Sequence, residues 1–177
     1  MYQQLILDKI ASTIEETTPG SDDKLLELIS EAGRVFLAGA GRSALVSRFF
    51  AMRLIHSGYQ VSVVGEVATP SIQKGDLLIV ISGSGGTKSL LPFIDTAKKQ
   101  GAKVAVVSMK SASPMADLAD VVVQIGQDSS YEKIPEMPMG TTFELSTLIY
   151  LEATIAKIIH AKNLTEEEMR AVHANLE

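Results

Sequence analysis

The chain has 177 residues, of which 46% are hydrophobic and 21% charged, so it can fill the core of one domain and is too apolar for a disordered chain. Its 16 basic and 21 acidic residues give a net charge of −5, which disfavours general nucleic-acid binding because that binding needs a basic surface. The absence of cysteine excludes disulfides, thiolate catalysis and metal–thiolate sites, and three histidines disfavour a poly-histidine metal site. No stretch resembles a signal peptide or a membrane span, so we expect a cytoplasmic protein that binds neither nucleic acid nor membrane.

Residues 1–31 predict two helices. The first is indicated by apolar residues at helical spacing, namely Leu5, Ile6, Ile10 and Ile14. Residues 17–20 interrupt this pattern, and Ser21 is the expected N-cap of a second, amphipathic helix over residues 24–31.

Residues 34–161 predict an α/β core. Five short runs rich in valine and isoleucine do not alternate with polar residues, which is typical of parallel strands buried on both faces: 35–38, 61–64, 77–81, 104–107 and 121–125. Helical segments separate them at 43–57, 87–100 and, more briefly, 114–119. The alternation predicts a doubly wound, five-stranded parallel sheet flanked by helices, a flavodoxin-like α/β fold.

A polar, proline-bearing segment over residues 126–140 is expected to be an ordered loop, and a long helix over 141–161 follows it. This helix is apolar around much of its circumference, so we expect it to be buried, in part against another subunit. Thr165 and Glu168 fit a capping box that opens a C-terminal helix over about 165–176. The whole chain, 1–177, is therefore expected to be a single domain.

The loop after the first predicted strand reads Gly39-Ala-Gly-Arg-Ser43. Ligands of open α/β sheets bind outside the carboxyl ends of the strands. Here Gly41 lets the backbone approach a ligand, the next helix presents its N–H groups, Ser43 adds a hydroxyl and Arg42 a positive charge. Gly41, Arg42 and Ser43 are therefore candidate anion-binding residues.

The loop after the third predicted strand combines three glycines with three hydroxyl groups, at what the pattern predicts to be another helix start. Such a loop can form a nest of backbone N–H groups with hydroxyl donors around it, which suits a phosphate. The candidate binding residues are Ser82, Gly83, Ser84, Gly85, Gly86 and Thr87.

A dinucleotide-binding fingerprint is an alternative interpretation of the first loop. Gly39, Gly41 and Ala44 fit its G-x-G-x-x-A spacing, and Glu66 ends the second predicted strand, where an acid would bind a ribose. This alternative gives the loop over residues 82–87 no special role.

Two side chains are candidates for acid–base chemistry. Glu144 lies in the first turn of the long helix, where the residues alone fit a carboxylate that stabilises the helix N-terminus as well as a general base. His56 ends a helix about 20 Å long, so it lies far from the loop at the start of that helix and is expected to reach a site only in a neighbouring subunit. Glu152, in the middle of the long helix, is expected to be a solvated or paired charge.

Several segments together resemble the sugar isomerase (SIS) domain family, and within it the 6-phospho-3-hexuloisomerases: residues 39–43, 51–58, 64–66 with 69–70, 75–85 and 137–144. The resemblance covers about residues 5–161. It implies an isomerase that interconverts D-arabino-3-hexulose 6-phosphate and fructose 6-phosphate through a cis-enediol, in the ribulose monophosphate pathway of formaldehyde fixation. It also implies a phosphorylated ketohexose substrate, no metal, no other cofactor, and a homotetramer.

Residue by residue, the resemblance implies that Ser43 and the loop over residues 82–87 hold the phosphate and sugar, that Glu144 is the base, and that His56 assists from an adjacent subunit. Gly86 departs from the family pattern, which more often has a larger, charged residue there. Other SIS isomerases that act on aldose phosphates, and SIS domains that only sense sugar phosphates, remain alternatives.

Overall fold

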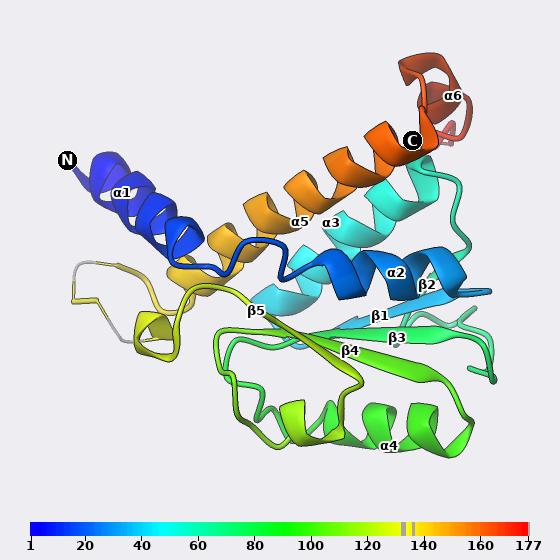
Figure 1. Cartoon of the computed structure of the whole chain (residues 1–177), viewed down its shortest axis with the longest axis horizontal. Helices are drawn as coiled ribbons and strands as arrows, with labels where there is room; N and C mark the ends of the chain where they lie inside the picture. The colour runs from blue at the N-terminus through cyan, green and yellow to red at the C-terminus, as the bar shows by residue number, and fades with distance from the viewer. Residues whose placement is uncertain (132–133, 136, 177) are drawn as a thin grey trace.

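The computed structural model describes residues 1–131, 134–135 and 137–176. It contains a five-stranded sheet between two layers of helices (Figure 1). The strands are β1 (Val35–Gly39), β2 (Val61–Val63), β3 (Leu77–Ile81), β4 (Lys103–Ser108) and β5 (Val121–Gln124). They lie in the order β2-β1-β3-β4-β5, and every neighbouring pair is parallel. The predicted doubly wound fold is confirmed, and each predicted strand end is correct to within one residue.

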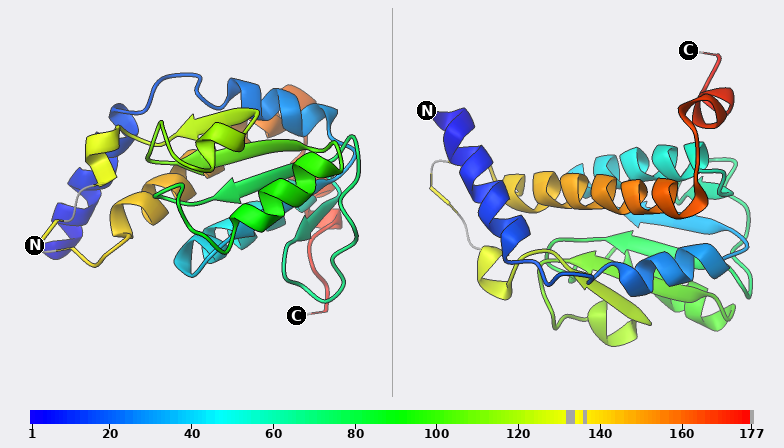
Figure 2. Two further views of the ribbon diagram at one scale, coloured as in Figure 1. Left: turned by 90° about the horizontal axis from the view of Figure 1, so that it is seen from below. Right: turned by 45° about the horizontal axis from the view of Figure 1, so that its top comes forward.

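The helices divide between the two faces of the sheet. One face is covered by α2 (Asp23–Glu31), α3 (Arg42–His56) and α5 (Thr141–Lys162), and the other by α4 (Leu91–Lys99) (Figures 1 and 2). The N-terminal α1 (Tyr2–Glu15) packs on α5, and α6 (Glu166–Ala171) follows the far end of α5. Two short 3-10 helices, Ala116–Leu118 and Asp128–Tyr131, flank β5.

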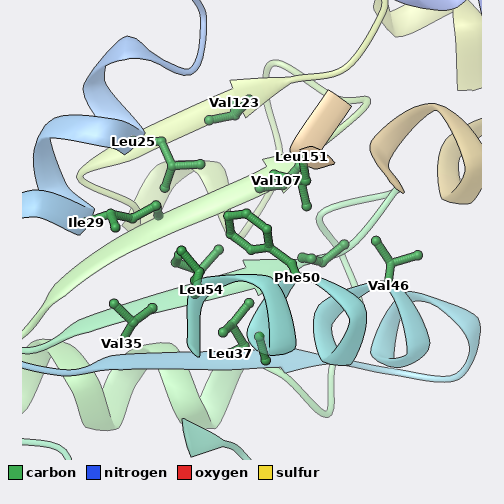
Figure 3. Close-up of a cluster of buried hydrophobic side chains, with 14 of the residues drawn as sticks. Leu25, Ile29, Val35, Leu37, Val46, Phe50, Leu54, Val107, Val123 and Leu151 are labelled. Atoms are coloured by element: carbon green, nitrogen blue, oxygen red, sulfur yellow. The ribbon is translucent and has the colours of Figure 1, made fainter. Parts of the chain in front are cut away.

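Alternate residues along each strand face opposite helix layers, because side chains of a strand alternate between its two faces. On β1, Val35 and Leu37 join the core under α2, α3 and α5, whereas Phe36 packs toward α4. Figure 3 shows the first of these clusters, in which Phe50 of α3 lies among the strand residues. The central strands β1, β3 and β4 are buried on both faces as predicted, but β2 and β5 are only half-buried because they form the edges of the sheet.

Several helix boundaries differ from the sequence predictions, and the helix predicted over 114–119 is only a 3-10 helix over Ala116–Leu118. α4 begins at Leu91 rather than at residue 87, because residues 87–90 form a turn and Pro92 occupies the first helical turn. The N-cap of α2 is Asp22 rather than Ser21, whose hydroxyl pairs with that of Tyr150 at 2.5 Å. α6 has the predicted Thr165 capping box but ends at Ala171. The predicted loop over residues 126–140 contains a 3-10 helix, and its residues 132, 133 and 136 lie outside the described residues.

A buried carboxylate joins α2 to α5. Asp22 is 2% exposed and accepts hydrogen bonds from Lys157 (2.6 Å), Thr154 (2.9 Å) and Tyr150 (3.2 Å). Burial raises the pKa of Asp22, but the hydrogen bonds and the charge of Lys157 outweigh burial and the net pKa is lowered. These contacts join the start of α2 to the middle and second half of α5. Within the described residues, no helix is long and apolar enough to cross a membrane.

Candidate active site

The two glycine-bearing loops lie next to each other at the carboxyl edge of the sheet. β1 and β3 are neighbours, and their last residues, Gly39 and Ile81, are partners in the register. β2 lies on one side of β1 and β3 on the other, so the chain changes direction across the sheet between β1 and β3. The two loops follow these two strands and therefore lie at the point where the strand order reverses. This point is where ligands of open α/β sheets bind.

The first loop leaves the N-terminus of α3 open to a ligand. Gly41 has φ +57° and ψ −129° and is the N-cap of α3, without a side-chain cap. A Cβ on Gly39 would lie 2.8 Å from the backbone of Ser43, so only glycine allows this close turn. Ala44 N–H donates to the carbonyl of Gly41 at 3.1 Å, whereas among the described residues none accepts a hydrogen bond from the N–H groups of Arg42 or the half-buried Ser43.

The second loop closes on itself through its own polar groups. The hydroxyls of Ser82 and Thr87 pair at 3.1 Å, and Gly86 N–H donates to Ser84 Oγ at 3.2 Å. Among the residues that the structure describes, none accepts a hydrogen bond from the N–H groups of Ser84, Thr87 or Lys88. Because α4 starts only at Leu91, the predicted helix start at this loop is wrong. The donors that the loop could offer an anion are these N–H groups and hydroxyls.

Neighbouring segments support this second loop, and sequence reasoning missed them. Ser108 Oγ and Met109 N–H both donate to the carbonyl of Gly83, at 3.1 and 3.2 Å, and Met115 N–H donates to that of Gly85 at 3.1 Å. On its other side, Gly83 packs so tightly against Phe143 that a Cβ would lie 2.9 Å from the ring. Ser108 ends β4, the next strand of the sheet, so the rule that locates sites at strand ends could have found it.

Glu144 lies in the first turn of α5, beside the first loop. It is 9% exposed, and its carboxylate oxygen Oε2 accepts a hydrogen bond from Nε of Arg42, 102 positions away in the sequence. The other oxygen, Oε1, is folded over Gly140, where a Cβ would lie 2.6 Å away. Gly140 has φ +87°, so this residue combines a left-handed conformation with a close approach that a side chain would prevent. The structure thus brings Glu144 and Arg42 together, and Ser43 follows Arg42 in the first turn of α3.

His56 does not join this group within one chain. It is 8% exposed at the opposite end of α3 from Arg42, and its ring stacks on that of His173 with centroids 5.0 Å apart. The expected pairing of Glu152 is observed, since Arg53 lies 2.9 Å from it.

A cavity of about 350 Å³ adjoins the candidate site. Gly140 and Phe143 are among its lining residues, but Arg42, Glu144 and the loop over residues 82–87 are not, so it is a neighbouring space rather than the predicted phosphate site. In the described part of the chain, no three histidine or acidic side chains are grouped so that they could hold a metal ion.

The SIS domain family matches residues 28–154, and the chain belongs to this family. The match includes the residues of the alternative dinucleotide fingerprint, and Glu66, its proposed ribose ligand, instead pairs with Arg48 at 2.9 Å.

The chain is similar along nearly its whole length to 3-hexulose-6-phosphate isomerases. The isomerase of that name from Methylomonas aminofaciens is 62% identical over 178 residues, which cover 99% of this chain and 98% of the relative. The one from Mycobacterium gastri is 41% identical, with 98% and 88% coverage. A crystal structure from Methanococcus jannaschii, from which a function of 3-hexulose-6-phosphate isomerase was inferred, has a TM-score of 0.88 and 35% identity over 99% of both chains.

Proposed function

We propose that this protein is a 3-hexulose-6-phosphate isomerase, which converts D-arabino-3-hexulose 6-phosphate and fructose 6-phosphate into each other. The observation that carries the proposal is the 62% identity with an isomerase of that name across both chains. The fold alone would also fit an isomerase of aldose phosphates or a module that only binds sugar phosphates. The buried carboxylate between two anion-binding loops favours an enzyme, because binding a phosphate requires no base.

In this reaction the carbonyl moves from C3 to C2 without net oxidation. Glu144 takes the proton from C2, the C–H electrons form the C2=C3 double bond, and the C3=O π electrons move to the C3 oxygen, which takes a proton from water and gives a cis-enediol. Glu144 then returns its proton to C3, while the hydroxyl on C2 gives its proton back to water and becomes the carbonyl. The chemistry thus needs one base and no electron acceptor.

The phosphate is remote from the reacting carbons, and the two loops give it a defined place. Ser43, the N-terminus of α3 and the free N–H groups of Ser84, Thr87 and Lys88 supply its donors. Binding energy from the phosphate holds C2 within reach of Glu144. The phosphate does not react, but it thereby contributes to the reaction at C2 and C3.

We also propose that the protein assembles as a homotetramer and works in the cytoplasm, where phosphorylated sugars of the ribulose monophosphate pathway are made and used. The apolar side chains of α5 that suggested an interface are mostly covered by the chain itself, although Ile149 is exposed. α3 instead presents a stripe at helical spacing, with exposed Leu45, Phe49, Met52 and Ile55. A stripe of this kind is typical of a surface that another subunit covers.

The proposal is tested by incubating the purified protein with 3-hexulose 6-phosphate and following fructose 6-phosphate. We expect conversion without added metal or nicotinamide, and equally in excess chelator. Failure to convert this substrate, with efficient conversion of an aldose phosphate, would contradict the proposal.

A further inference from the structure

The ion pair between Arg42 and Glu144 occupies the carboxylate that the proposed reaction needs. Oε2 of Glu144 is bound by Arg42, and Oε1 is folded over Gly140. A carboxylate oxygen that already accepts a charge-assisted hydrogen bond is a weaker acceptor for a further proton. While Arg42 is bound to it, Oε2 of Glu144 is not free to take a proton from a sugar.

The two partners differ strongly in exposure. The side chain of Glu144 is 11% exposed, whereas that of Arg42 is 60% exposed. Only Nε of Arg42 contacts the carboxylate, and among the described residues none accepts a hydrogen bond from its two terminal nitrogens. The guanidinium can therefore take a second partner from the solvent side, while Glu144 remains fixed at the start of α5.

Arg42 lies at the proposed phosphate site. It is the first residue of α3, next to Ser43, and a positive charge at a helix N-terminus is unfavourable because the helix dipole is positive there. A phosphate bound at this N-terminus would meet Arg42 directly, and it carries more charge than the single carboxylate of Glu144. The substrate phosphate is thus a strong competitor for the guanidinium.

We propose that Arg42 couples phosphate binding to proton abstraction by exchanging partners. In the free protein Arg42 holds Glu144, and when the substrate binds, its phosphate takes the guanidinium and leaves Oε2 free to accept the proton from C2. The inference rests on the proposed function and adds a regulation of its site: the base becomes available only when a phosphorylated sugar is present.

The test uses the sugar with and without its phosphate. Wild-type protein is given phosphorylated 3-hexulose in one arm, and saturating unphosphorylated 3-hexulose with and without inorganic phosphate in the other. We expect inorganic phosphate to speed wild-type turnover of the unphosphorylated sugar at least tenfold, because it draws Arg42 away from Glu144.

The decisive variant is Arg42→Gln, with Arg48→Gln as the matched control. Arg48 lies on the same helix and pairs with the exposed Glu66, away from the two loops. Without phosphate, Arg42→Gln should turn over the unphosphorylated sugar several-fold faster than wild type, and inorganic phosphate should change that rate less than twofold. Arg48→Gln should respond to inorganic phosphate as wild type does, and melting temperatures check that both variants fold.

The outcomes separate the two proposals. If the wild type does not turn over the phosphorylated sugar, the proposed function fails and the coupling fails with it. If the wild type turns over the phosphorylated sugar but inorganic phosphate does not change its rate on the unphosphorylated sugar, only the coupling is overturned. The same holds if the wild type does not turn over the unphosphorylated sugar at all, with or without inorganic phosphate. The coupling is also overturned if Arg42→Gln is slower than wild type on the unphosphorylated sugar, since Arg42 would then assist the chemistry rather than restrain the base.

Discussion

Gly83, in the loop over residues 82–87, leaves no room for a side chain. Its carbonyl is held by Ser108 and Met109, so the backbone cannot retreat. A Cβ there would lie 2.9 Å from the ring of Phe143, whereas ordinary contacts begin at 3.4 Å. In Gly83→Ala the ring of Phe143, which is 4% exposed in the core, must therefore move by about half an ångström.

This movement predicts a measurable loss of stability and activity. Overpacking a core costs about 1–3 kcal/mol, which in a domain of this size lowers the melting temperature by about 2–12 °C. Because Phe143 precedes Glu144, the shift also displaces the carboxylate, and turnover should fall by up to about a hundredfold.

Gly86→Ala is the matched control in the same loop. A Cβ on Gly86 would have only Ser84 near it, at 3.8 Å or more, so this variant should melt and turn over as wild type does. Thermal unfolding followed by circular dichroism, together with steady-state kinetics, measures both effects. A Gly83→Ala protein that melts within 1 °C of wild type with unchanged turnover would refute the packing argument.

Three further predictions concern stability and assembly. Asp22→Asn should lower the free energy of unfolding at pH 7 by about 1.5–3 kcal/mol in denaturant titrations. Because the pKa of the folded Asp22 is lowered, this difference should be present above pH ~4 and shrink as the pH falls through the folded pKa; a pH-independent difference would argue against the ion pair. Thr147→Val should raise the free energy of unfolding by about 1 kcal/mol, since the Thr147 hydroxyl is fully buried without a hydrogen-bond partner among the described residues. A loss of stability in this variant would show that the hydroxyl makes a stabilising hydrogen bond. Phe49→Glu should reduce the mass in light scattering to that of a smaller assembly, whereas a monomeric wild type would disprove the proposed tetramer.

The sequence was most informative where local chemistry alone determines structure. The valine- and isoleucine-rich runs located all five strands, because a strand buried on both faces must be apolar throughout. The start of α4 was misplaced because the glycine- and hydroxyl-bearing loop continues into a turn, although Pro92 was a usable signal for the first helical turn. The rule that ligands bind at strand ends located both loops, and it would also have found Ser108.

Contacts between distant segments could not be predicted in the same way. The pairing of Arg42 with Glu144 joins the starts of two helices that are 102 residues apart, and no local pattern specifies it. The packing of Phe143 on Gly83 likewise depends on how α5 settles on the sheet layer. From the residues alone Glu144 could equally have been a helix-terminal carboxylate, and only its burial beside the loops favours the base.

The most direct test of the account is Glu144→Gln, which keeps the shape of the side chain and removes its basicity. We expect turnover of 3-hexulose 6-phosphate to fall by about a hundredfold or more, exchange of the substrate's carbon-bound proton with deuterated water to stop, and fructose 6-phosphate still to bind. Glu152→Gln is the matched control, because Glu152 lies on the same helix and also pairs with an arginine of α3. Near-normal turnover and proton exchange in Glu144→Gln would contradict the assignment of the base.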